Sequence, residues 1–154
     1  MPFSPIWDAM TAHFFTSASL SRIAAMNEAE CQVEGWWKGE IIWLLGQLKK
    51  TGAVKAWDRE CRSVNGRQDF EIELANTIAG IEVKTALCGS QKGHTWDLPW
   101  YAKDPKRFFP PDIRKLAAIQ APNRYFLVFA HASPPNTDWQ VMLNELRRST
   151  SGIA

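Results

Sequence analysis

The sequence has few cysteines, no long apolar run and no recognisable export signal. Its 154 residues include three cysteines, Cys31, Cys61 and Cys88, and no C-x-x-C pair. An odd number without metal-ligand spacing predicts free thiols in a reducing compartment and no structural zinc site. No apolar stretch approaches the roughly 20 residues that span a bilayer, and no basic region precedes an apolar one at the N-terminus. We therefore expect a cytoplasmic protein that does not enter a membrane.

The length and composition suit one globular domain. The chain is 45% hydrophobic and 22% charged, which allows a sizeable core. No repeat, low-complexity tract or long linker divides it. We expect a single domain over residues 1–154, with an accessory segment at 1–26, a core at 27–131 and a C-terminal extension at 132–154.

The formal net charge of +2 is unevenly distributed along the chain. Residues 1–83 contain eight Lys/Arg and eleven Asp/Glu, whereas residues 84–154 contain ten and five. A basic half that follows an acidic half suits a polyanionic substrate held through a metal. Ordinary solvated charges would give the same totals.

The first predicted core element is a helix that begins near Asn27 and ends near Lys50. Asn27 with Glu30 three residues later resembles a capping box, and Gly52 supplies a stop. Apolar residues recur at helical spacing and form a broad stripe, which consists of Val33, Trp36, Trp37, Ile41, Trp43, Leu44 and Leu48.

The remaining pattern predicts an α-β-β-β-α-β order. Three strands are expected at 53–61, 67–74 and 78–87, with an Asn65-Gly66 hairpin turn between the first two. A long connection then leads to a short helix that Asp112 caps. The chain continues with an apolar strand at 124–131, which we expect to be buried on both faces, and a strand or helix at 139–148.

Two of the predicted strands bring charged residues together. Strand alternation places Asp69, Glu71 and Glu73 on one face, and Glu82 shares a face with Lys84. A hairpin loop of two or four residues pairs odd-numbered with even-numbered residues. All five side chains then lie on the same face of the sheet, unless a bulge alters the register.

This arrangement suits metal-assisted hydrolysis. Crowded carboxylates repel each other unless a cation is present, and Mg²⁺ typically binds one or two carboxylates together with water and phosphate oxygens. Lys84 could orient or deprotonate the attacking water, or stabilise charge on the phosphate. A solvated acidic face with cross-strand Glu–Lys pairs would explain the same pattern equally well.

Glu40 adds a third acid. On a helical wheel it falls inside the apolar sector, where a carboxylate is costly unless a metal or a lysine compensates it. It could instead lie at the edge of the sector and reach solvent, or the helix could break at Gly39.

Together these features resemble the PD-(D/E)xK nuclease superfamily, the restriction-endonuclease-like fold, over roughly residues 28–131. The resemblance implies an α/β domain with an αβββαβ core, in which helices flank a central mixed sheet. It implies that Asp69 and Glu82 bind the metal, that Lys84 is the catalytic lysine and that Glu40 is the additional helix acid. Lys115 resembles the basic residue that faces the active site or the phosphates. Gln68 precedes Asp69 where the family motif has proline, a proline that many members lack.

Further basic residues are candidates for nucleic-acid contacts. Besides Lys115, these are Lys92, Lys103, Lys106 and Arg107. Lysines in the 91–103 segment are interleaved with Trp96, Trp100 and Tyr101, which could stack on bases. The same aromatics could instead cover a hydrophobic edge or form a dimer contact.

The leading hypothesis is a Mg²⁺-dependent endonuclease that hydrolyses DNA, with Mn²⁺ as a substitute metal and RNA as an open alternative. A homodimer would provide two active sites for a double-strand cut. One alternative is an inactive subunit of the same fold that binds nucleic acid or a protein. Another is a domain with an acidic strand face and no role with nucleic acid.

Overall fold

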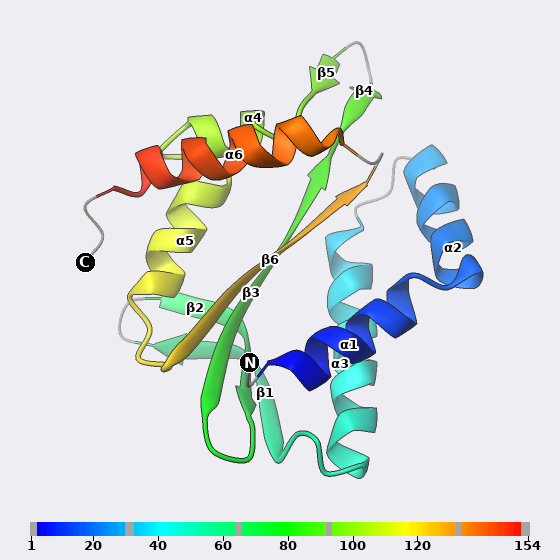
Figure 1. The fold of residues 1–154 in the computed structure, drawn as a ribbon, viewed down its shortest axis with the longest axis vertical. Helices are drawn as coiled ribbons and strands as arrows, with labels where there is room; N and C mark the ends of the chain where they lie inside the picture. The colour runs from blue at the N-terminus through cyan, green and yellow to red at the C-terminus, as the bar shows by residue number, and fades with distance from the viewer. Residues whose placement is uncertain (1–2, 30–32, 64–65, 92–93, 132–133, 152–154) are drawn as a thin grey trace.

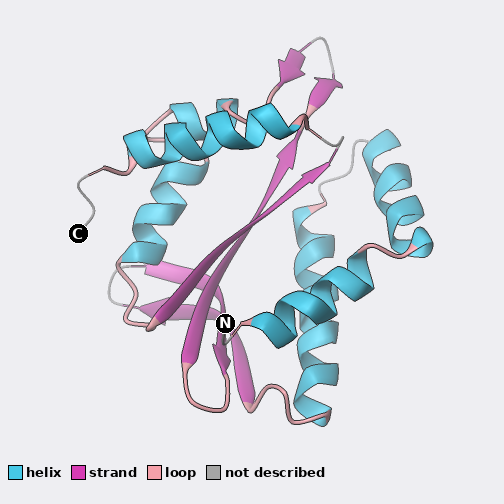
Figure 2. Cartoon of the chain, viewed as in Figure 1, coloured by secondary structure: helices cyan, strands magenta, loops and turns pink. Residues whose placement is uncertain are grey.

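The computed structural model describes residues 3–29, 33–63, 66–91, 94–131 and 134–151. It is an α/β protein in which three helices precede a four-stranded mixed sheet, and helices pack on both faces of that sheet (Figures 1 and 2). The helices are α1 (Ser4–Phe14), α2 (Ser17–Glu28), α3 (Glu34–Lys50), α4 (Trp100–Lys103), α5 (Phe109–Ala117) and α6 (Asn136–Ser149). The strands are β1 (Ala56–Ser63), β2 (Gly66–Glu73), β3 (Ile78–Leu87), β4 (Gly89–Gln91), β5 (His94–Trp96) and β6 (Asn123–His131).

The main sheet has the order β1-β2-β3-β6. Strands β1, β2 and β3 are antiparallel neighbours, and β6 runs parallel to β3. Phe70 pairs with Ile81 and Glu73 with Ile78, so a four-residue loop joins β2 to β3 and odd residues oppose even ones. This register is the one that the alternation of the sequence predicts.

Helices α1 and α3 cover one face of the sheet. Helix α3 buries Trp37 and Ile41 against the sheet, where Trp37 stacks on Phe129 with ring centroids 3.9 Å apart. Helix α1 adds Phe14, which meets both of these rings edge-on. The N-terminal accessory segment is therefore two helices, and the first of them completes this half of the core.

Helices α5 and α6 cover the other face (Figure 1). Phe109 of α5 lies against Phe126 of β6, and Met142 and Leu146 of α6 belong to the same buried cluster. The long connection before α5 is not irregular throughout, because it contains the β4–β5 hairpin and the short helix α4.

Several predicted boundaries are corrected. Asn27 lies within α2 rather than at the start of α3, and its predicted capping partner Glu30 falls outside the described residues. Strand β1 begins at Ala56, since the amides of residues 53 and 54 bond to the Leu48 carbonyl at the end of α3. Ser63 pairs directly with Gly66, so the hairpin connection that includes Asn65 also lies outside the described residues.

Two further predictions change at the C-terminal half. Helix α5 begins at Phe109, with proline in its first turn, where a missing N–H costs little. Asp112 is therefore inside the helix and does not cap it. Strand β6 lies at the edge of the sheet and is mostly half-buried rather than buried on both faces. Residues 136–149 form a helix, and no helix in the described part of the chain could span a membrane.

Candidate active site

Asp69 and Glu82 lie opposite each other where β2 separates from β3. The pairing of the two strands ends at Phe70 and Ile81, one residue before this position. Beyond that pair, the Val83 amide of β3 donates a hydrogen bond to the side chain of Asp69, with 2.8 Å between its nitrogen and Oδ2. The Glu82 side chain is only 2% exposed. The two predicted metal-binding acids are therefore brought together by the hairpin register.

Glu82 and three other charged groups form a closed ring of ion pairs. Lys84 Nζ lies 3.2 Å from Glu82 Oε1 and 3.1 Å from Asp112 Oδ2. Lys115 Nζ lies 2.8 Å from Glu82 Oε1 and 3.2 Å from Asp112 Oδ1. Asp112 and Lys115 sit one turn apart on α5, so this helix supplies both partners to the strand. Lys115 faces the site, as the resemblance implies.

Helix α3 reaches the same place from the other side. Lys38 Nζ lies 2.8 Å from Asp69 Oδ1 and 2.7 Å from Glu34 Oε1. We call the seven residues the acid–lysine cluster: Glu34, Lys38, Asp69, Glu82, Lys84, Asp112 and Lys115. Four carboxylates and three ammonium groups give the cluster a formal charge of −1 when all are ionised.

The surroundings raise the pKa of three residues of the acid–lysine cluster. Burial raises the pKa of Glu82, and the charge of Asp69 raises it further, although Lys115 and Lys84 act in the opposite direction. Burial by itself would lower the pKa of Lys84, but Asp112, Glu82 and Glu34 together raise it above that of a free lysine. Lys38 is also raised in pKa, because bonds to Asp69 and Glu34 outweigh its burial. Both lysines are therefore cations at neutral pH.

The donor set fits a hard divalent cation. Glu82 Oε2 is buried and has no hydrogen-bond partner among the described residues, while Asp69 lies close enough to repel it. Among those residues no group of three histidines, cysteines or acids converges into a metal centre. Mg²⁺ does not require three, since one or two carboxylates with water and substrate oxygens suffice. Asp69 and Glu82 are the residues that would hold it.

The structure does not bring Glu40 to the cluster. Its carboxylate lies 2.6 Å from His13 Nε2 of α1, and His13 stacks on Trp43. Trp43 is 53% exposed, so the apolar sector that enclosed Glu40 on the helical wheel is not all core. The acid that α3 supplies is Glu34, which begins the helix.

The other predicted contacts are scattered. Lys103, Lys106 and Arg107 are exposed, and Arg107 lies 3.8 Å from Asp104. Lys92 falls outside the described residues. Trp100 packs on Phe108, and Tyr101 stacks on Phe109 while its hydroxyl bonds to the Leu87 backbone. These two aromatics therefore cover a hydrophobic edge, as one of the sequence alternatives holds.

Glu71 and Glu73 are exposed on β2, and Glu71 accepts a hydrogen bond from Gln68 at 3.1 Å. Sequence reasoning missed Glu34 and Lys38. Their spacing of four residues marks a helical ion pair, but it does not show which end of the helix faces the sheet. Comparisons of the chain with protein-family profiles, curated proteins and solved structures found no match.

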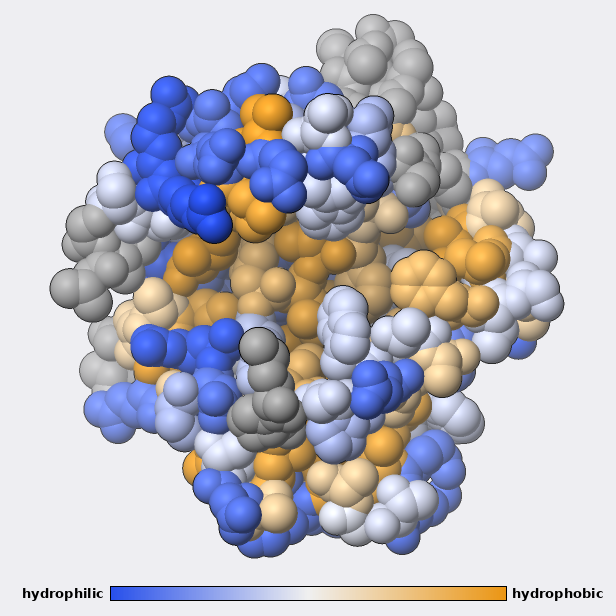
Figure 3. Space-filling model, in the orientation of Figure 1, coloured by the Kyte–Doolittle hydropathy of each residue, from blue (hydrophilic) through white to orange (hydrophobic). Residues whose placement is uncertain are grey.

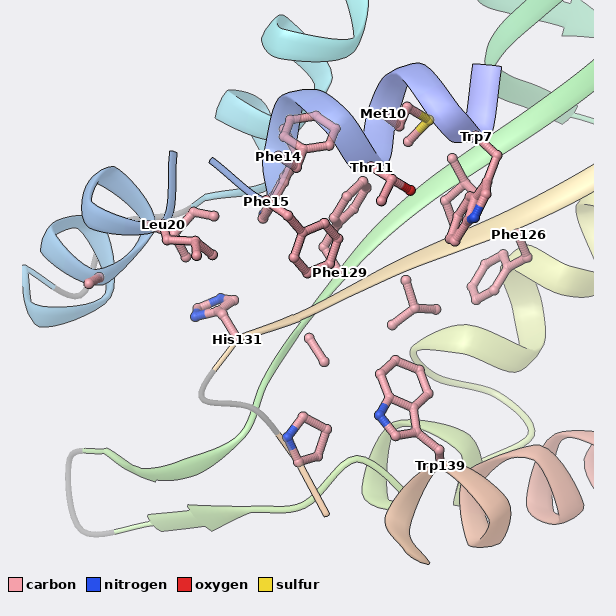
Figure 4. Close-up of a pocket in the computed structure, with 17 residues that line it drawn as sticks. Trp7, Met10, Thr11, Phe14, Phe15, Leu20, Phe126, Phe129, His131 and Trp139 are labelled. Atoms are coloured by element: carbon pink, nitrogen blue, oxygen red, sulfur yellow. The ribbon is translucent and has the colours of Figure 1, made fainter. Parts of the chain in front are cut away.

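A separate apolar groove of about 640 Å³ runs along β6, between α1 and α2 on one side and α6 on the other (Figures 3 and 4). Consecutive residues 126–131 of β6 line it, so it follows the open edge of that strand. Trp7 and Phe15, at its rim, are 56% and 73% exposed. None of its described lining residues belongs to the acid–lysine cluster.

Proposed function

We propose that this protein is a Mg²⁺-dependent nuclease of the restriction-endonuclease-like fold that hydrolyses phosphodiester bonds in DNA. The observation that carries the proposal is Asp69 opposite Glu82, with Oε2 of Glu82 buried and unpartnered among the described residues and Lys84 Nζ 3.2 Å from Oε1. The order of helix, three strands, helix and parallel strand from α3 to β6 supports the fold assignment. The free thiols of Cys61 and Cys88 are consistent with a cytoplasmic location.

In this proposal the acids hold the metal, and the lysines act on the water, the phosphate and Glu82. A bound Mg²⁺ would lower the pKa of its water and draw charge from the phosphate. Lys84 is held as a cation, so it would orient the attacking water or stabilise the phosphorane charge rather than remove a proton. Lys115 would keep Glu82 ionised and aimed at the metal, since it bonds to the oxygen that the metal does not need.

The test is cleavage of supercoiled plasmid, linear duplex, single-stranded DNA and RNA with Mg²⁺ or Mn²⁺. Lys84→Met removes an electrostatic stabiliser and is expected to lower the cleavage rate by about 10²–10³-fold. Lys49→Met is the matched control, because Lys49 is an exposed lysine near the far end of α3. Equal rates for wild type and Lys84→Met would remove Lys84 from the mechanism.

One observation favours a second candidate, an inactive member of the fold that binds nucleic acid. Both oxygens of Asp69 are already paired, one with Lys38 and the other with the Val83 amide. The charges of the cluster also nearly cancel without a metal, since its formal charge is −1. This candidate predicts salt-sensitive binding to DNA and no metal-dependent cleavage of any of the four substrates.

A further inference from the structure

Lys38 occupies the place where a cation would meet Asp69. Its ammonium group lies 2.8 Å from Asp69 Oδ1, and the Val83 amide takes Oδ2 at 2.8 Å. Asp69 therefore has no oxygen that is free of a protein partner. On the other side of the site, Glu82 Oε2 is free and buried. A divalent cation bound at Glu82 Oε2 displaces no protein partner in the described part of the chain, but it meets Asp69 Oδ1 only when Lys38 moves.

The geometry points to Lys38 as an internal competitor of the divalent cation at Asp69. This inference rests on the proposed function, because it concerns the same metal site. Metal binding and the Lys38–Asp69 ion pair exclude each other, so each weakens the other by the same factor. The lysine thus raises the metal concentration at which half of the sites are occupied.

Glu34 is a second carboxylate partner that Lys38 can keep when it leaves Asp69. It lies four residues before Lys38 on α3, and its Oε1 is 2.7 Å from the ammonium group. Lysine carries its charge on a flexible four-carbon stem, so the group can leave Asp69 and keep this partner. Both side chains are partly exposed, at 27% for Lys38 and 35% for Glu34. Because the ammonium group is not sealed from solvent, a phosphate of a bound nucleic acid can contact it after its release.

The competition couples metal to substrate. A phosphodiester that attracts the Lys38 ammonium draws it away from Asp69 and opens the oxygen that the metal needs. Metal affinity is therefore higher when nucleic acid is bound, and the metal in turn frees Lys38 for the phosphate. The Lys38–Asp69 ion pair weakens metal binding to the protein alone. It would therefore favour metal binding to the complex of the protein with nucleic acid.

The experiment measures Mn²⁺ binding to the full chain without nucleic acid, by the paramagnetic resonance signal of free Mn²⁺. Lys38→Met keeps the apolar stem and removes the charge, and is expected to bind Mn²⁺ about tenfold more tightly than wild type. Lys38→Arg restores a cation beside Asp69 and is expected to return the affinity toward the wild-type value. Lys49→Met removes an exposed lysine from the same helix and controls for net charge.

A second measurement uses the wild-type protein and does not depend on a substitution. The ¹⁵N resonance of the Lys38 ammonium is expected to shift on titration with Mg²⁺, whereas that of Lys49 stays fixed. Equal Mn²⁺ affinities for wild type and Lys38→Met, or an unmoved Lys38 resonance at saturating Mg²⁺, overturn the competition and leave the nuclease proposal standing. Absence of Mn²⁺ binding in both proteins overturns both proposals.

Discussion

Gly80 lies where the segment after α5 meets β3, and the chain has no room there for a methyl group. A Cβ atom at this position would lie 2.2 Å from Ile119 Cδ1 and 2.5 Å from Gln68 Oε1. Carbon atoms pack best at about 3.5–4.0 Å, so more than an ångström of displacement is needed. Ile119 and Gln68 are 5% and 3% exposed, which leaves them little space to give way.

We expect Gly80→Ala to lower the free energy of unfolding by about 1–3 kcal/mol, the usual range for an overpacked core. The displacement would also reach the active site. Lys115 precedes Ile119 by four residues, and Glu82 follows Gly80 by two on the same strand. A shift of α5 away from β3 would therefore lengthen the Lys115–Glu82 ion pair, which is now 2.8 Å.

The assay is urea unfolding of wild type, Gly80→Ala, Ile119→Val and the double variant. Valine lacks the Cδ1 atom that causes the closest contact, so Gly80→Ala is expected to cost less in the Ile119→Val background. The coupling energy should lie within about 0.5–3 kcal/mol, as for other contacting pairs. Gly46→Ala is the control, because Gly46 lies on α3 and a Cβ atom there would have no neighbour within 4 Å.

Alanine at position 46 is expected to stabilise the protein by up to about 1 kcal/mol through its helix propensity. The steric argument would be refuted by a Gly80→Ala variant as stable as wild type. It would be refuted equally by additive effects in the double variant, since that outcome would leave Ile119 without a part in the cost.

Two further predictions concern residues outside the cluster. Glu40→Gln removes the carboxylate that lies 2.6 Å from His13 Nε2 and is expected to cost less than about 1 kcal/mol, since both side chains are partly exposed. It should leave the Mn²⁺ affinity unchanged, and a weaker affinity would return Glu40 to the metal site. Burial lowers the pKa of His131 below its ordinary 6.5, so the unfolded state takes up its proton first as the pH falls. Stability should therefore decline from about pH 6.5 downward, and His131→Gln should show less of this decline in thermal unfolding; parallel pH profiles would contradict the assignment.

The meeting of Asp69 and Glu82 was predictable because it depends on local rules. Side chains alternate along a strand, and the length of the hairpin loop fixes which residues face each other. The loop between β2 and β3 has four residues, so the predicted parity holds and both acids share one face with Lys84.

The contribution of α3 was not predictable in the same way. A helical wheel gives the direction of each side chain around the axis but not its height along the sheet. The position of α3 is set by Trp37 on Phe129 and by the packing of α1, which are contacts between segments far apart in the chain. They place Glu34 and Lys38 at Asp69 and leave Glu40 with His13.

The burial of β6 shows the same division. Its nearly continuous apolar run predicts a strand correctly, but the sheet order places that strand at an edge, where a groove follows it. Periodicity and turn length determined by themselves the four strands of the main sheet, the register of β2 on β3 and the pair of acids with Lys84, because each is a property of neighbouring residues. Only the tertiary structure decided that Glu34, Lys38 and Asp112 join them, because that depends on how α3 and α5 dock on the two faces of the sheet. The same docking closes the site with its own lysines.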